Sequence, residues 1–391
     1  MLFRIYLLLI LFGVGIRIIR QTIIHLSEET MSDAFKATPA TITEHFSPAW
    51  FAAIMGTAVI PLAISFIDFA WIRPLAQGLI LFSALVFFLF LLPWTGKFLF
   101  YRHNVLKDLN HPIAANFFPT MPISLILFSL NLLKFPDMFF APETSLQLAL
   151  GLWLLGTTGI YVMGFIILMH IFRHQEIKMQ HANFGWYIPP VSKLIIPLAG
   201  FELAGHFPAF AELAMTISLV SFGVGFFLFL FVGAAVYHRY IYHELPMNRF
   251  AATFFIGIAP TAIITVSLAK LMHLTATSGL MGLDPAVVAT LCKIGIVMAW
   301  GFAAWWHIMA VIITCYYIRR ITLPYALSWW AFTFPSGALC VASGIAWQTT
   351  GFAVIHFFYL YAVAFLLLAW TIVLIQTTKG VLAGNIFAPT H

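Results

Sequence analysis

Five apolar segments of this chain are interrupted by proline or glycine, and each is followed by an uninterrupted apolar segment. The interrupted segments cover residues 48–66, 116–133, 185–200, 254–271 and 329–346. A proline inside a helix removes one backbone hydrogen bond, and lipid offers no partner for the carbonyl group that is left over. We therefore expect the five interrupted helices to face one another or water, and not lipid.

The composition excludes a soluble protein. The chain is 62% hydrophobic and only 8% charged, whereas soluble domains carry about 25% charged residues. Apolar runs of about 20 residues recur, and each is long enough to cross ~30 Å of hydrocarbon. The net charge of +6 resides mostly in loops, which indicates membrane topology and no nucleic-acid partner. The three cysteines lack metal-ligand spacing and are interpreted as packing thiols.

The spacing of the apolar runs predicts an all-α integral membrane protein with ten transmembrane helices. Candidate kink prolines recur at 189, 260 and 335, at intervals of 71 and 75 residues. Such a repeat predicts five tandem helical hairpins around one axis, with the odd helices inside and the even helices outside. The expected helices are about 46–67, 76–100, 114–134, 145–172, 187–206, 211–240, 249–272, 286–316, 325–347 and 352–377.

Loop charge predicts the orientation. Nine basic residues follow or precede the cytoplasmic ends of the predicted helices: Arg102, Lys107, Arg173, Lys178, Arg239, Arg249, Arg319, Arg320 and Lys379. The opposite loops carry only Arg73, Lys134 and Lys270. By the positive-inside rule, both ends of the ten-helix unit are cytoplasmic, and all five interrupted helices run the same way. The expected location is the plasma membrane, as in a bacterial inner membrane.

The repeat also predicts the domain boundaries. Residues 1–44 form a leader, residues 45–380 the ten-helix domain, and residues 381–391 a short cytoplasmic tail. Residues 1–30 are apolar with flanking arginines and fit an eleventh helix, an interfacial segment or an upstream mis-start. We favour a mis-start or a dispensable leader, because Met31 precedes a polar stretch that resembles a natural beginning.

The ninth predicted helix offers a candidate gate. Phe332 and Phe334 flank Thr333 immediately before Pro335. A kink there would tilt an aromatic side chain into a pore, and apolar constrictions gate by excluding water. The alternative is that both phenylalanines are ordinary core residues. In the first helix, Gly56 would leave room for an aromatic residue from a neighbouring inner helix, or simply allow close helix packing.

Ionisable residues inside the predicted helices mark a pathway or a structural pairing. Lys193 lies within the fifth helix and is a candidate for attracting anions into the pore. The alternatives for Lys193 are snorkelling toward the interface or an ion pair with Glu202. Glu202 and His206 are one turn apart and form a candidate proton relay, whereas Lys270 is close enough to a helix end to snorkel.

The sequence carries no sign of an enzyme or a bound cofactor. No CxxCH, HExxH, Walker or GxGxxG motif is present. A bis-histidine haem requires two histidines that face each other at the same membrane depth, and His170, His307 and His356 do not have that spacing. We therefore expect no catalytic residues, no metal and no cofactor. A membrane redox or lipid enzyme is the remaining alternative from another class, and it predicts a chromophore or metal in the purified protein.

Three passages resemble the tellurite-resistance/dicarboxylate transporter family, which includes plant slow anion channels, malate permeases and sulfite exporters. They are HFSPAWFAAIMGT at 45–57, HPIAANFFP at 111–119 and WWAFTFP at 329–335. The resemblance implies five hairpins around a pore, a homotrimer, and closure by a phenylalanine of the ninth helix. The resemblance assigns this gate to Phe334, with Phe332 as the second candidate. It assigns the glycine that packs against the gate to Gly56. Ala58 departs from the Gly-Thr-Gly of several relatives.

Together these observations predict a gated anion channel or passive exporter for chloride, nitrate, sulfite or malate-type anions. The alternative is a proton-coupled carrier for malate, sulfite or tellurite-type anions. The inner helices contain no arginine beyond Arg249 at a helix start, although paired arginines suit a tight dicarboxylate site, so a channel is favoured. The predicted pore-lining and gate-packing residues are Gly56, Thr57, Pro119, Pro122, Pro189, Pro190, Pro260 and Pro335.

Overall fold

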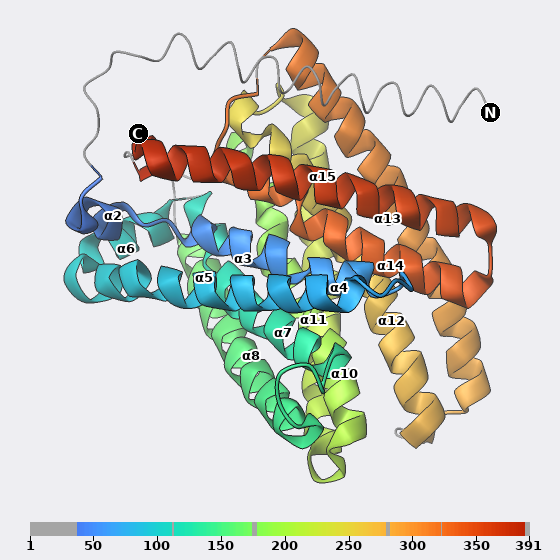
Figure 1. The fold of residues 1–391 in the computed structure, drawn as a ribbon. Helices are drawn as coiled ribbons and strands as arrows, with labels where there is room; N and C mark the ends of the chain where they lie inside the picture. Colours follow the sequence, from blue (N-terminus) through green and yellow to red (C-terminus); the bar gives the residue numbers. More distant parts are fainter. Residues whose placement is uncertain (1–36, 112, 174–177, 279–281, 322, 388–391) are drawn as a thin grey trace.

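The computed structural model describes residues 37–111, 113–173, 178–278, 282–321 and 323–387 (Figure 1). Every regular element among these residues is helical, which confirms the all-α prediction. Residues 1–36 of the predicted leader lie outside the described residues, so the three interpretations of residues 1–30 stay open.

Long helices occupy the positions of the even-numbered predictions. They are α5 (Ile72–Phe100), α8 (Pro142–Arg173), α11 (Ala211–Tyr242), α13 (Pro285–Arg320) and α15 (Ala353–Ala383). Only 17–33% of the most apolar stretch of each helix is buried within the protein. Such exposed apolar surface is stable only against lipid. These are the outer helices. The expectation that they lack prolines is wrong for α5, which contains Pro93.

The interrupted segments alternate with the outer helices, and each changes from a 3₁₀ turn into an α-helix. We call them the inner segments. In three of them 72%, 89% and 94% of the apolar stretch is buried, as expected for helices that face protein. Their elements are η1 (Pro48–Trp50) with α3 (Phe51–Ala58) and α4 (Ile60–Ile64), η2 (Ala114–Phe117) with α7 (Thr120–Lys134), η4 (Phe184–Tyr187) with α9 (Ile188–Leu194) and α10 (Ile196–His206), η6 (Asn248–Ile258) with α12 (Ala259–Ser278), and η8 (Leu327–Phe332) with α14 (Phe334–Thr350).

Proline positions explain the interruptions. Pro61, Pro189, Pro197 and Pro335 all occupy the first turn of an α-helical element. A proline there costs no helical hydrogen bond, because the first-turn N–H groups have no partner within the helix. Pro189 and Pro335 therefore begin α-helices after 3₁₀ turns, and Pro61 and Pro197 begin a second α-helical piece after the first one ends. These prolines do not bend continuous helices, contrary to the prediction from the sequence pattern.

Eight helices among the described residues are long and apolar enough to cross a membrane. The number becomes nine if the pair Pro39–His45 and Pro48–Ile64, bent by 91°, counts as one crossing. The last inner segment has an α-helix of only 17 residues after its 3₁₀ turn. Multiple membrane-spanning helices are thus present, and the number ten stays a prediction.

The inner segments close into a ring. Around it, α4 contacts α7, α7 contacts α10, α10 contacts α12, α12 contacts α14, and α14 returns to α4. The 3₁₀ turns form a second closed circuit in the same order, from η1 through η2, η4, η6 and η8 back to η1. Two circuits in one order mean that the five inner segments run side by side in the same direction.

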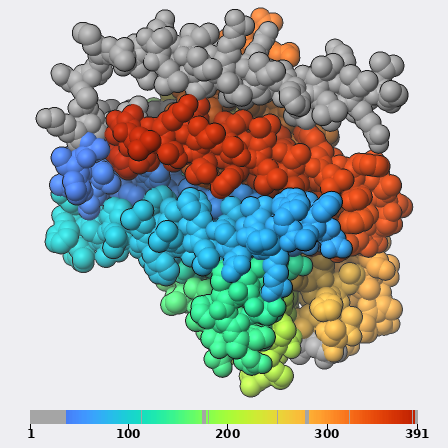
Figure 2. All heavy atoms as spheres, viewed as in Figure 1, coloured from blue at the N-terminus to red at the C-terminus, as the bar shows by residue number. Residues whose placement is uncertain are grey.

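Each outer helix packs against the inner segment that precedes it in the chain. Figure 1 shows this for the first segment, in which α3 and α4 lie between α5 and α15. In the space-filling view, side chains of α5 and α15 cover most of this face and leave a strip of the first segment between them (Figure 2). The architecture is therefore an inner ring of interrupted segments within an outer layer of long helices.

Side chains of the outer layer donate hydrogen bonds to the interrupted backbone. Trp153 Nε1 on α8 donates to the carbonyl of Ile196, at the second interruption of its inner segment. Trp306 Nε1 on α13 donates to Phe254 in η6, and the Tyr359 hydroxyl on α15 donates to Ala63 in α4. Because lipid cannot supply these donors, the outer layer both shields the ring and satisfies part of its backbone.

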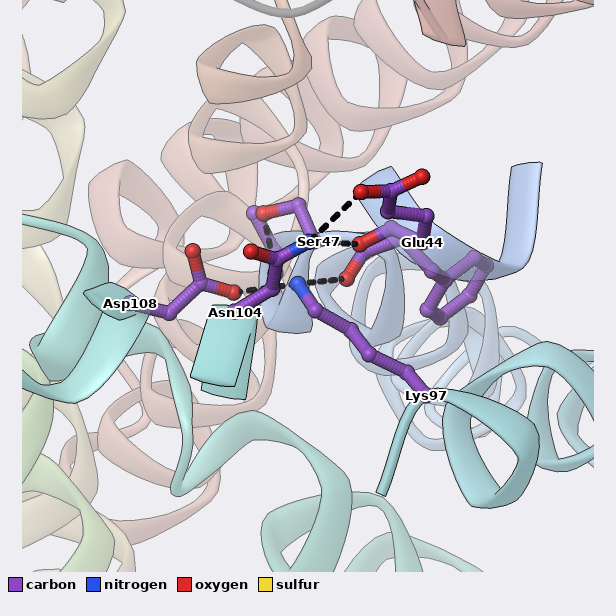
Figure 3. Close-up of polar contacts among 7 residues, drawn as sticks. Glu44, Ser47, Lys97, Asn104 and Asp108 are labelled. Carbon is purple, nitrogen blue, oxygen red and sulfur yellow. Dashed lines mark hydrogen bonds and ion pairs between the residues drawn. The ribbon is translucent and has the colours of Figure 1, made fainter. Parts of the chain in front are cut away.

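A buried lysine fixes the start of the first inner segment (Figure 3). The ammonium group of Lys97, on α5, is 2% exposed and donates to the carbonyl of Phe46 at 3.0 Å and to Asp108 at 2.6 Å. Asp108 belongs to α6 (Arg102–Asn110). From the same helix, Asn104 donates to the side chain of Glu44 at 3.2 Å, in α2 (Pro39–His45). Lys97 therefore joins three elements at one end of the ring.

Replacing Lys97 by methionine should destabilise this end of the ring. The change leaves the Phe46 carbonyl and the Asp108 carboxylate without their charged donor, a loss of about 1–3 kcal/mol for hydrogen bonds to a charged group. Thermal unfolding of the purified protein in detergent measures the effect. Lys107→Met is the matched control, because Lys107 is an exposed lysine on α6. Equal melting temperatures for the two variants would contradict the assigned role of Lys97.

Candidate functional site

The interior of the ring is the candidate site, and its narrowest packing lies where the first and last inner segments meet. A Cβ placed on Gly56 would overlap the Thr333 hydroxyl oxygen and lie 2.8 Å from Thr333 Cβ and 3.1 Å from the ring of Trp330. Gly56 therefore permits the approach of the residues just before Phe334. Gly337 of α14 repeats this arrangement, because a Cβ there would lie 3.1 Å from Val59 Cβ.

Hydrogen bonds hold this junction from both sides. Thr333 donates its hydroxyl to the carbonyl of Trp330 at 2.7 Å, at the change from 3₁₀ to α-helix. Thr57, next to Gly56, accepts a bond from Trp370 Nε1 of α15 at 3.1 Å. Trp330 in turn donates to Thr377 of α15 at 3.1 Å. The outer helix α15 thus fastens both partners of the Gly56–Thr333 contact.

The two candidate gate residues differ in their surroundings. Phe332 is 8% exposed, and its ring packs edge-on against Phe255 at 4.9 Å and Trp329 at 5.9 Å. Phe334 is 6% exposed and makes no ring–ring contact with another described residue. Phe332 is therefore anchored in an aromatic cluster, whereas Phe334 begins α14 without such an anchor.

The predicted pore-lining prolines all lie near the changes from 3₁₀ to α-helix. Pro119 precedes α7, and Pro122 lies in its first turn. Pro122 also packs against the outer helix α8, where it contacts the positions of Gly156 and Gly159. Pro189 and Pro190 lie in α9, and Pro260 is the second residue of α12.

Lys193 is buried in α9, with 3% of its surface exposed. Its ammonium group donates to the Ser192 hydroxyl at 3.3 Å and lies beside Gly164 of α8, where an added Cβ would fall 3.0 Å from Lys193 Cε. These contacts place the charge at the interface between the inner ring and an outer helix. Its attraction of anions stays a prediction.

Glu202, the first member of the predicted proton relay, forms an ion pair with Lys270 of α12. The alternative pairing of Glu202 with Lys193 is wrong, because Lys193 lies against α8 and Glu202 is bonded to Lys270 on the neighbouring inner segment. His206 is exposed as the last residue of α10. The relay itself is untested.

Phe66, Lys134, Glu202 and Lys270 come together at the end of the ring opposite Lys97, and we call them the lysine mouth. Lys134 ends α7, and its ammonium group lies over the ring of Phe66, 5.8 Å from the centroid. It also interacts electrostatically with Lys270 and Glu202. The Phe66 ring fills the space beside Gly344 of α14, where an added Cβ would lie 2.7 Å from it. The fifth inner segment thus borders the mouth as well.

Sequence reasoning did not identify the lysine mouth as a site. It counted Lys134 only as a loop charge, interpreted Lys270 as a loop charge that snorkels from a helix end, and omitted Phe66. A usable signal was the similar position of Lys134 and Lys270 near the ends of two inner segments. Helices that run in parallel around one ring place their equivalent ends together, so two such lysines meet at one mouth.

Adding a methyl group at Gly56 should separate the first and last inner segments. We expect Gly56→Ala to lower stability by about 1–3 kcal/mol, the usual cost of overpacking, because the new Cβ meets Thr333. Thermal unfolding in detergent measures this loss. The matched control is Gly78→Ala on α5, where an added Cβ has no atom within 4 Å, and alanine there should be neutral or favourable by about 0.5–1 kcal/mol. If Gly56→Ala unfolds at the wild-type temperature, the contact between Gly56 and Thr333 has room for a methyl group and the assigned close packing is wrong.

Comparison with known proteins indicates the family of this chain. The model of the voltage-dependent anion channel family, SLAC1, matches residues 45–378. An uncharacterised transporter of Methanocaldococcus jannaschii is 34% identical over 88% of this chain and 96% of its own length. The malic acid transport protein of Schizosaccharomyces pombe is 22% identical over 75% of this chain and 68% of its own. A sulfite efflux pump of Arthroderma benhamiae is 22% identical over 82% of this chain and 86% of its own length.

The matched region begins and ends within two residues of the predicted domain, 45–380. It includes all three passages that carry the family resemblance. The resemblance is confirmed: the chain belongs to the voltage-dependent anion channel family, SLAC1.

Proposed function

We propose that this protein is a gated anion channel or passive anion exporter, with its pathway through the ring of inner segments. The observation that carries the proposal is the closure of that ring at both the α-helical and the 3₁₀ level. A closed ring of parallel segments surrounds one axis, which runs from the Lys97 end to the lysine mouth, and the proposed pathway follows this axis. Membership of an anion-transporting family supports the choice of anions as cargo.

The proposal includes ten membrane crossings, five by outer helices and five by inner segments. The α-helical part of each inner segment is shorter than the whole segment, because the segment begins as a 3₁₀ turn. The 3₁₀ residues extend the segment across additional membrane depth. The basic residues at the 3₁₀ ends support a cytoplasmic location for this side and for both ends of the ten-helix unit. A plasma-membrane homotrimer with one path per subunit follows from the family resemblance and belongs to the proposal.

Phe334 is the proposed gate. It begins α14 directly after Thr333, whose position against Gly56 fixes the backbone at this point. Phe332 is held by aromatic neighbours on η6 and η8, so Phe334 has more freedom to change its side-chain position. A single apolar side chain at a constriction blocks ions by excluding water.

Removing the Phe334 ring should raise anion flux. In proteoliposomes with reconstituted protein, we expect Phe334→Ala to increase chloride or nitrate flux roughly tenfold or more, because a dewetted constriction becomes wide enough for water. Phe332→Ala is the matched control and should mainly lower thermal stability, because it removes a ring from an aromatic cluster. No increase in flux for either variant would rule out a phenylalanine gate in this helix.

The second candidate function is proton-coupled transport of malate or another C4-dicarboxylate, or of sulfite or tellurite-type anions. The relatives named for malic acid and sulfite favour this class of cargo, and Glu202 supplies a partly exposed carboxylate in the ring. This alternative predicts malate uptake that saturates and becomes faster at acid pH, and Glu202→Gln should abolish the pH dependence. Malate uptake whose rate does not change with pH would favour the channel.

A further inference from the structure

The lysine mouth has an unequal charge balance. It contains the two ammonium groups of Lys134 and Lys270 and the single carboxylate of Glu202, all from different inner segments. Within the described part of the chain, Glu202 is paired with Lys270, and Lys134 has no carboxylate within ion-pair distance. One positive charge is therefore left unbalanced at the end of the proposed pathway.

Phe66 provides Lys134 with an uncharged neighbour. The ammonium group lies over the Phe66 ring, and this cation–π contact holds the lysine without neutralising it. The ring itself is fixed against Gly344 and packs edge-on against Tyr359 at 5.8 Å. Lys134 is thus positioned by a rigid aromatic group while its charge remains available to a ligand.

The Glu202–Lys270 pair shows that Lys270 binds a carboxylate group. Lys270 and Glu202 are 33% and 23% exposed, so both partners reach solvent. An ion pair between solvent-accessible side chains contributes little stability, and a dissolved anion can replace the carboxylate. A buried pair such as Lys97–Asp108 would resist that exchange.

We propose that the lysine mouth is a capture site for small anions, an inference that rests on the proposed transport of anions. Lys134 and Lys270 bind the anion together, and Glu202 is a tethered competitor that leaves Lys270 when the anion arrives. A dicarboxylate or other divalent oxyanion is stabilised by the ammonium groups of both lysines, whereas chloride pairs with only one of them. The site therefore favours divalent anions at this face of the membrane.

Other charged groups at this end do not share the arrangement. Asp68, His206 and His273 are exposed. Arg73 and Asp137 form their own ion pair at 2.7 Å, with both side chains more than half exposed. Arg73 lies in the first turn of α5 and Asp137 in the connection after α7, on the same side of the ring, so this pair provides a control for a change of charge on this face.

The test measures the half-saturating concentration of malate and of chloride for flux, with the anion applied to each face of an oriented bilayer in turn. Lys134→Gln and Lys270→Gln should raise this concentration roughly two- to fivefold at the lysine-mouth face, the effect of about one solvent-accessible charge contact. The opposite face should be unaffected. Glu202→Gln should lower it, because the competitor is removed. Arg73→Gln should change neither face, and Lys134→Arg should restore the wild-type value.

A binding measurement separates this inference from the proposed function. Malate should raise the melting temperature of the wild-type protein in detergent, because a ligand that binds only the folded state stabilises it. The rise should be smaller in Lys134→Gln and larger in Glu202→Gln. A wild-type protein that binds malate without flux would refute the transport proposal alone. Anion flux whose half-saturation is unchanged in both lysine variants, or raised in Glu202→Gln, would overturn the capture site.

Discussion

The structure depends on one requirement: backbone polar groups inside a membrane must find their partners within the protein. The inner segments change from 3₁₀ turns to α-helices at prolines, so their backbone cannot satisfy itself as a continuous helix does. Donors such as Trp153, Trp306 and Tyr359 reach these carbonyls from the outer layer. The double-layered architecture follows, because an interrupted segment exposed to lipid would leave carbonyls without donors.

The same interruptions give the ring its functional asymmetry. One end is fastened by the buried Lys97, which pairs with Asp108 and donates a hydrogen bond to the start of the first inner segment. The other end carries a partly exposed pair and a lysine held over an aromatic ring. The two carboxylates are similarly exposed, but Lys97 is 2% exposed and Lys270 is 33% exposed. A buried ammonium group is costly to leave unpaired and suits a fixed anchor, whereas a solvent-accessible one exchanges partners easily. The burial of the lysines therefore separates an anchoring end from a binding end.

Close contact at small residues connects these two ends. Along the boundary of the first and last inner segments, Gly56 receives Thr333, Gly337 receives Val59, and Gly344 receives Phe66. Gly56 lies on the first segment, and Gly337 and Gly344 lie on the last, so each segment supplies both a space and a side chain that fills a space on its partner. The start of α14, with Phe334, is thereby set by a contact surface that extends to the lysine mouth.

The sequence by itself determined the membrane class, the family and the positions of the outer helices. Apolar runs of sufficient length permit only a membrane helix, and the largest error at an outer-helix end is six residues, 377 predicted against Ala383. It also identified the inner segments, because proline and glycine are readable without a structure. The tertiary structure decided how those segments meet. Prolines became helix starts, Lys193 turned toward α8, and Lys134, Glu202 and Lys270 came together from segments about 70 residues apart. A linear pattern gives depth along each helix but not rotation about its axis, and contacts between segments depend on that rotation.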